Sequence, residues 1–151
     1  MTPIDEPIGL FVARVARNLS RSFDTALETH DSNVASWLVL ASLAGGLRRT
    51  QRAIADDIGI DAATITYHLN RMESAELVRR ERDPADRRAQ RVELSDTGRD
   101  HFFALLETVQ DFDRQLRAGF SNRDLATLRR LLGRLADNAA AHHHRKEPSS
   151  S

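Results

Sequence analysis

Cysteine is absent from this 151-residue sequence. Its absence excludes disulfide bonds, a thiolate nucleophile, cysteine-ligated zinc and thiol-based redox sensing within the chain. No stretch approaches the roughly 20 apolar residues that a membrane-spanning helix needs. Residues 1–7 have neither the basic region nor the apolar run of a secretory signal. We therefore expect a cytoplasmic protein.

The chain also lacks an excess of charge of either sign, since 22 basic residues balance 22 acidic ones. Zero net charge does not exclude a polyanionic partner, because a local patch sets the field at a binding surface. From Arg71 to Arg91, seven arginines stand against five acids, and Lys146 is the only lysine of the chain. Arginine favours bidentate contacts to phosphate and guanine, although a genome that prefers arginine codons explains the bias equally well.

Signatures of catalysis are missing too. The sequence has no glycine-rich phosphate loop, no cysteine and no histidine–acid constellation with catalytic spacing. We expect a protein that is not an enzyme and needs no cofactor. Its 40% hydrophobic and 29% charged residues fit one globular domain with a real core.

The spacing of apolar residues predicts long helices near both ends of the chain. Residues 8–30 place an apolar side chain every four positions, as one face of a helix does. Residues 96–141 hold two helices whose apolar spacings alternate between three and four, the seam of a helix that packs along another. These helices exceed what a small core must cover. We expect 8–30 and 96–141 to form a homodimer interface, the alternative being that they fold back on their own core, and 142–151 to be a disordered tail.

The middle of the chain predicts three shorter helices. Residues 34–44 are apolar almost all round and are expected to form the buried centre of the domain. Thr50 and Asp61 are suited to be the N-caps of two short helices, 51–58 and 62–74. Two short helices joined by a three-residue turn containing glycine form the helix-turn-helix signature.

Two strands follow these helices. Residues 77–82 and 90–94 have strand character, and residues 83–89 between them are turn-forming and rich in arginine. A winged helix-turn-helix needs this order, because one helix enters the major groove of DNA and a basic hairpin reaches the backbone or the minor groove. We therefore predict a mainly α fold with a small β-wing, a winged helix-turn-helix core over 34–95, and duplex DNA as the partner.

The exposed face of the 62–74 helix and the turn after it carry the predicted DNA contacts. Threonine and tyrosine can meet thymine methyl groups, asparagine can pair bidentately with adenine, and arginine can bind guanine or phosphate. In the turn, one guanidinium can enter the minor groove while another binds phosphate. Asp86 is expected to pair with a nearby arginine and fix the shape of the loop. The competing interpretation is that each of these residues, taken alone, is an ordinary solvent-exposed surface residue. The predicted DNA-binding residues are Thr64, Thr66, Tyr67, His68, Asn70, Arg71, Arg87, Arg88 and Arg91.

The turn and second strand also carry a motif. Residues 86–98, Asp-Arg-Arg-Ala-Gln-Arg-Val-Glu-Leu-Ser-Asp-Thr-Gly, closely resemble the wing signature of the MarR (multiple antibiotic resistance regulator) family, with residues 50–59 and 64–73 as upstream partners. The similarity extends over helix order and lengths from about residue 8 to residue 140. It implies a homodimer of triangular outline, with the first, fifth and sixth helices at its interface, that binds a palindromic operator.

The resemblance also implies a transcription regulator, usually a repressor, that is often released by a small aromatic or anionic ligand. By the motif match, Asp86 and Arg88 take the family's wing positions. Tyr67 and His68 are bulkier than the commoner residues at those recognition positions, so no operator sequence can be carried over.

Effectors in this family often lodge between the dimerisation helices and the DNA-binding core. By location, the candidates for ligand binding are Trp37, His30 and Arg14, although a tryptophan on an apolar helix is more often a core residue. The sequence leaves open the effector, the operator, the target genes and the choice between repression and activation.

Two other functions remain as alternatives. A metal-responsive regulator would use His142–His144 with His101 or acidic residues, but we expect no metal site there because consecutive histidines in a tail bind metal weakly. A winged-helix module that binds proteins is also conceivable, since folds do not fix function. Such a module would need an apolar patch in place of the arginine-rich wing.

Overall fold

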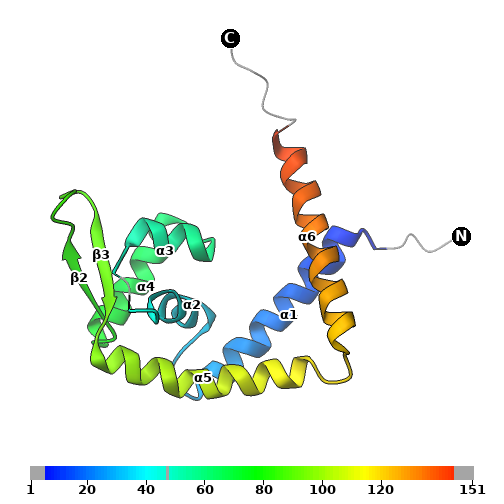
Figure 1. Cartoon of the computed structure of the whole chain (residues 1–151), viewed down its shortest axis with the longest axis horizontal. Helices are drawn as coiled ribbons and strands as arrows, with labels where there is room; N and C mark the ends of the chain where they lie inside the picture. Colours follow the sequence, from blue (N-terminus) through cyan, green and yellow to red (C-terminus); the bar gives the residue numbers. More distant parts are fainter. Residues whose placement is uncertain (1–5, 47, 145–151) are drawn as a thin grey trace, which may run out of the picture. The chain divides into compact units, whose positions relative to one another are not determined.

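The computed structural model describes residues 6–46 and 48–144, and the chain divides into two units, 1–112 and 113–151, that are described separately. The fold is mainly α with a small antiparallel sheet, as predicted (Figure 1). The elements in chain order are α1 (Ile8–Glu28), α2 (Val34–Leu43), β1 (Arg49–Thr50), α3 (Gln51–Ile58), α4 (Ala62–Ser74), β2 (Val78–Arg82), β3 (Gln90–Leu94), α5 (Asp96–Leu116) and α6 (Asn122–His144).

Helix α2 is the centre of the first unit, which confirms the prediction made from its apolar character. It contacts α1, α3, α4 and β3, and Val39, Leu40 and Leu43 are fully or almost fully buried. The core around it combines residues from every layer of the unit, namely Leu27, Ile54, Ala55, Ile65, Leu69, Met72, Val78, Val92 and Leu105. One contiguous cluster therefore holds α4 and the β2–β3 hairpin in fixed positions.

The helix ends follow the local sequence. The side chains of Thr50 and Asp61 accept the backbone N–H groups of Ala53 and Thr64, as expected of N-caps. Gly59 has a φ of 74°, the left-handed conformation that closes α3. These local interactions set the short turn between α3 and α4, so the predicted helix-turn-helix is confirmed.

The sheet has one strand more than the two that we predicted. Its order is β1-β3-β2, with Arg49 opposite Val92 and Val78 opposite Leu94. Strand β1 is only two residues long, and so short a strand carries no alternating pattern by which it could be predicted. It pairs with the edge of β3 that β2 leaves open.

In the second unit, α6 ends at His144, whereas we expected the tail to begin at residue 142. The three alanines at 139–141 are the best helix formers and favour this extension. The rest of the predicted tail, residues 145–151, lies outside the described residues. Across 6–46 and 48–144, no helix combines the length and the apolar character that a bilayer crossing requires.

Candidate nucleic-acid interface

Helix α4 turns a polar face outward. Its residues Ile65, Leu69 and Met72 are buried in the core, which fixes the rotation of the helix about its axis. The opposite face is exposed, and Tyr67 there is 56% exposed. The structure thus places the predicted recognition residues at the surface, either on this exposed face or along its edges.

The two threonines of this helix have structural hydrogen bonds. Thr64 donates its backbone N–H (2.8 Å) and its hydroxyl (2.7 Å) to the carboxylate of Asp61, and these bonds hold the pKa of Asp61 below its usual value. The Thr66 hydroxyl lies 2.8 Å from the carbonyl oxygen of Ala62 and accepts from Nε2 of Gln51 at 2.6 Å. Gln51, which the sequence analysis did not select, therefore ties α3 to α4.

Tyr67, His68 and Arg71 form a group on the next turn. Nη1 of Arg71 donates to the Tyr67 hydroxyl at 3.1 Å, and its guanidinium carbon lies 5.8 Å from the centre of the tyrosine ring. The ring of His68 meets that of Tyr67 edge-on, with centroids 5.4 Å apart. Burial, followed by the charge of Arg71, lowers the pKa of His68. His68 is therefore neutral at neutral pH and offers no charge to a phosphate.

Asn70 is joined to the sheet by Arg80 of β2. Nη2 of Arg80 donates to Oδ1 of Asn70 at 2.7 Å, and the same guanidinium forms an ion pair with Glu73. Sequence reasoning missed Arg80. The available signal was its position two residues after the buried Val78, because alternate strand residues share a face.

The ion pair that we expected Asp86 to form within the wing is formed by Asp83 instead, and Asp86 shapes the loop through a backbone hydrogen bond. The side chain of Asp83 is only 8% exposed, and its carboxylate accepts from Nε of Arg91 at 2.7 Å and from the backbone N–H of Ala85 at 2.8 Å. Asp86 instead accepts the backbone N–H of Arg88 at 2.9 Å. An aspartate directly before proline favours such a turn, so the Asp83-Pro84 pair was the signal that we missed.

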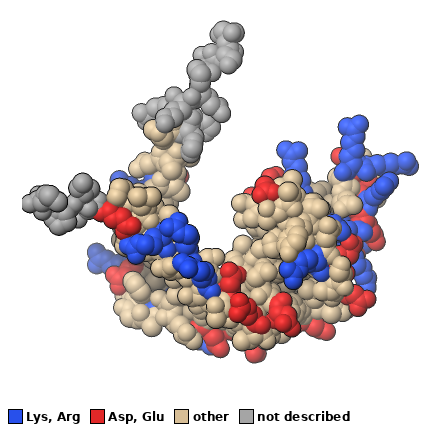
Figure 2. Space-filling view, turned by 180° about the vertical axis from the view of Figure 1, so that it is seen from behind, with Lys and Arg blue, Asp and Glu red and all other residues tan. Residues whose placement is uncertain are grey.

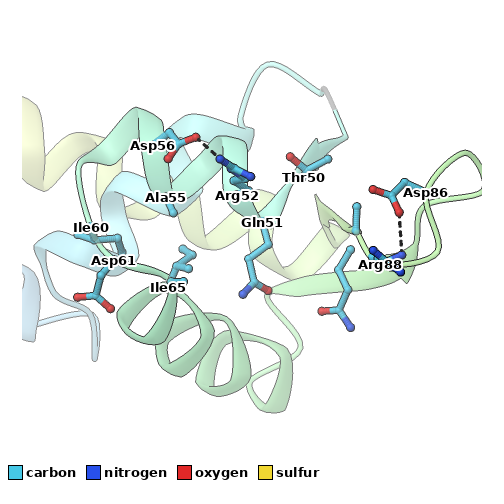
Figure 3. Close-up of a pocket in the computed structure, with 13 residues that line it drawn as sticks. Thr50, Gln51, Arg52, Ala55, Asp56, Ile60, Asp61, Ile65, Asp86 and Arg88 are labelled. Atoms are coloured by element: carbon cyan, nitrogen blue, oxygen red, sulfur yellow. Dashed lines mark hydrogen bonds and ion pairs between the residues drawn. The ribbon is translucent and has the colours of Figure 1, made fainter. Parts of the chain in front are cut away.

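Arginines gather over the wing, with acidic residues among them (Figure 2). Arg87 and Arg88 are exposed, whereas Arg91 is 42% exposed at its side chain and has its Nε committed to Asp83. A hollow of about 770 Å³ separates the wing from α3 and the start of α4 (Figure 3). Gln51 and Asp61 line it from the helices, and Asp86, Arg88 and Gln90 line it from the wing. The wing arginines and the face of α4 are thus held in one unit.

The three candidates for ligand binding do not form one site. The Trp37 ring is half-buried, stacks on Phe102 of α5 with centroids 5.2 Å apart and packs against the core. His30 is half-buried, with Nε2 3.0 Å from the Thr108 hydroxyl. Arg14 is exposed and pairs with Glu6 at 2.8 Å. Arg14 precedes the end of α1 by 14 residues, a distance of about 21 Å along the helix, and so lies far from His30.

Burial lowers the pKa of His101 in the same region, and the neighbouring His30 lowers it further. Within the described part of the chain, no three histidine, cysteine or acidic side chains lie close enough to hold a metal ion. The side chains of His143 and His144 lie outside the described residues, so the alternative of a metal site in the tail is not tested there.

The Asp83–Arg91 pair predicts that acid weakens the wing. Because Arg91 above all holds the pKa of Asp83 below its usual value, the carboxylate stabilises the folded state above its unfolded-state pKa of about 3.9. That contribution is lost as the pH falls through the lowered folded pKa.

We expect Asp83→Asn to have a lower melting temperature than wild type at pH 5–7, with a difference that closes toward pH 3. Thermal melts of both proteins at each pH measure this difference in melting temperature. Asp56→Asn, at an exposed acid, is the control, and an Asp83→Asn gap that is independent of pH would contradict the prediction.

Comparisons with known proteins agree with this geometry. Residues 30–89 match the family model described as the MarR family. A relative, the uncharacterized HTH-type transcriptional regulator YdgJ of Bacillus subtilis (strain 168), is 30% identical over 89 residues, which are 59% of this chain and 54% of the relative. The match thus spans about half the length of that relative.

Two solved structures are similar over most of the chain. A mutant MarR from E. coli complexed with operator DNA has a TM-score of 0.79 and 25% identity, covering 85% of this chain and 93% of that one. The PcaV transcriptional regulator from Streptomyces coelicolor, in complex with its natural ligand, has a TM-score of 0.78 and 23% identity, covering 92% and 99%. In its helix-turn-helix, its wing and its order of helices, the chain is thus similar to transcription regulators of the MarR family.

Proposed function

We propose that this protein is a regulator that binds a specific palindromic operator in duplex DNA as a homodimer and represses transcription. The observation that carries the proposal is the exposed polar face of α4 beside an arginine-bearing wing within one packed unit. The similarity to a MarR structure that contains operator DNA supports it. A protein-interaction module would instead need an apolar surface at this face.

Two elements, α4 and the wing, would make the contacts with DNA. Tyr67, Asn70 and Arg71 are exposed on α4 and would meet base edges in the major groove. Arg87 and Arg88 would meet phosphate or the minor groove from the wing. The edges of this contact surface would be formed by Thr64, Thr66 and His68. Arg91 would hold the wing in shape, and its remaining N–H groups would bind the phosphate backbone of DNA.

Exposed apolar side chains support the dimer. On α1 they are Ile8, Leu10, Phe11 and Leu19, and on α6 they are Leu128, Leu131 and Leu132, each more than 40% exposed. Large apolar side chains that recur along one helix are stabilised by burial against a partner. Two copies would also supply the two-fold symmetry that a palindromic operator requires.

We also propose that a small-molecule effector releases the protein from DNA. It is supported by the similarity to PcaV, whose structure contains a natural ligand. Of the three candidates, His30 is best placed, because it is half-buried and reaches α5 through Thr108. A ligand that displaced this contact would act between the two proposed dimerisation segments, 8–30 and 96–141, close to the start of α2.

Fluorescence anisotropy of the full chain on duplexes tiling its own upstream region tests the proposal, at about 150 mM salt and with nonspecific competitor DNA. We expect one fragment to bind tightly, to resist the competitor and to saturate at two chains per duplex. A version of that fragment with one half-site scrambled is the control. Weak binding to every fragment, falling steeply with salt, would mean nonspecific electrostatic attraction and would overturn the proposal.

A further inference from the structure

Arg80 of β2 fixes the side-chain amide of Asn70 at the surface of α4. Its Nη2 donates to Asn70 Oδ1 at 2.7 Å, while its Nε donates to the Glu73 carboxylate at 3.0 Å and its Nη2 bonds to the same oxygen. The Arg80 side chain is only 14% exposed. The guanidinium also lowers the pKa of Glu73, so the pair stays charged at neutral pH. A half-buried, charged pair therefore sets the orientation of an exposed amide.

The chemistry of the guanidinium decides which end of the amide faces it. Arginine has only hydrogen-bond donors, so the Asn70 atom beside it is the oxygen. That oxygen is thereby turned toward Arg80, which takes one of its two lone pairs. Within the described residues, no hydrogen bond uses the Asn70 Nδ2, and Asn70 is exposed. Its two N–H donors are left for a partner outside the chain.

Adenine and guanine present different hydrogen-bonding groups to such an amide in the major groove. Adenine presents the N7 acceptor beside the N6 donor, and an unconstrained asparagine matches both with its nitrogen and its oxygen. Guanine presents two acceptors, N7 and O6. With its oxygen committed to Arg80, Asn70 would bring N–H against the N6–H of adenine, whereas both of its donors suit guanine.

We propose that Arg80 is a specificity-determining residue, which orients Asn70 so that it reads guanine rather than adenine. This inference rests on the proposed function, because it concerns the same DNA-binding surface. It also revises the pairing of Asn70 with adenine that the residue type alone suggests. Arg80 is a positioning residue here, since it acts through Asn70 and needs no contact with DNA.

Selection of binding sites from a library of randomised duplexes tests the readout, with the full-length chain as the binder. A parallel selection with Asn70→Ala identifies the base pair that Asn70 reads, as the position where the preference relaxes. At this position we expect wild type to favour guanine over adenine by about 5- to 150-fold in dissociation constant. A preference for adenine there, or no position that responds to Asn70→Ala, would overturn the inference.

Two further variants separate the role of Arg80 from that of the asparagine alone. Arg80→Met releases the amide, so the guanine-to-adenine ratio should fall at least about fivefold at that one position. Asn70→Asp keeps an oxygen for Arg80 but presents an acceptor outward, so the preference should move to cytosine, whose N4 donates. Arg79→Met is the matched control, because it removes the same charge from an exposed neighbour in β2 and should leave the preference unchanged.

Melting curves of each variant establish whether it is folded, and Asn70→Asp decides the matter if Arg80→Met unfolds. An unchanged base preference in a folded Arg80→Met or in Asn70→Asp would overturn the inference while leaving specific DNA binding intact. If wild type itself enriches no sequence, the proposed function fails, and this inference fails with it.

Discussion

Gly98→Ala is expected to cost the protein about 3 kcal/mol or more of folding stability, since overpacking against a rigid neighbour is among the most damaging single changes. Gly98 is buried in the first turn of α5. A Cβ atom there would lie 1.9 Å from the carbonyl oxygen of Leu77 and 2.8 Å from its carbonyl carbon. Both atoms belong to the backbone, so no rotation of a side chain can relieve the clash.

The displacement would also break the junction between the wing and α5. The backbone N–H of Ser95 donates to that same Leu77 oxygen at 3.1 Å, and the Ser95 hydroxyl accepts the N–H of Gly98 at 2.9 Å. Moving α5 away from Leu77 therefore costs hydrogen bonds as well as packing. In a chain of this size, 3 kcal/mol corresponds to a fall in melting temperature of about 6–12 °C.

Thermal or urea unfolding of the two proteins measures the effect. Gly133→Ala in α6 is the matched control, because an added Cβ there meets no neighbour within 4 Å. The control should stabilise its helix by about 0.5–1 kcal/mol, since alanine is the better helix former. If Gly98→Ala melts within 2 °C of wild type, by an approximate scale of under 1 kcal/mol, α5 does not pack on Leu77 as described.

The features that the sequence predicted well depend on neighbouring residues. Thr50 and Asp61 cap their helices because a short polar side chain can reach an N–H three residues on. Gly59 closes α3 because glycine tolerates a positive φ. The all-round apolar character of α2 indicated its burial without any knowledge of its partners. Helix order and the position of the wing follow from such local rules.

The features that sequence reasoning missed depend on which residues meet across elements. The wing contains two aspartates, and only the folded hairpin shows that Asp83, rather than Asp86, receives the Arg91 guanidinium. Strand alternation places Arg80 on the same face as Val78, but no local pattern indicates that it meets Asn70 of α4. Likewise, Arg14 lies in α1 and His30 in the turn that follows it, and the length of the helix keeps them apart. The site was thus predictable by residue type and only partly by role.

Arg88→Ala is expected to weaken operator binding by about 10- to 100-fold, the range for losing a hydrogen-bonded charge. Arg88 is exposed, and it lines the hollow between the wing and α3. Its backbone, and not its guanidinium, is held by Asp86, so the loop keeps its shape after the change. The stability of the fold should change by less than about 0.5 kcal/mol, as for most surface residues. The lost affinity would then reflect a lost DNA contact.

The salt dependence of binding shows what kind of contact is lost. If Arg88 neutralises one phosphate, the slope of log affinity against log salt should become shallower by about one. Arg79→Ala is the matched control, because it removes the same charge from the face of β2 opposite to Arg80, away from α4. Anisotropy titrations at several salt concentrations compare the three proteins. Equal loss in both variants would mean that only the overall charge matters, and unchanged affinity in Arg88→Ala would remove the wing from the interface.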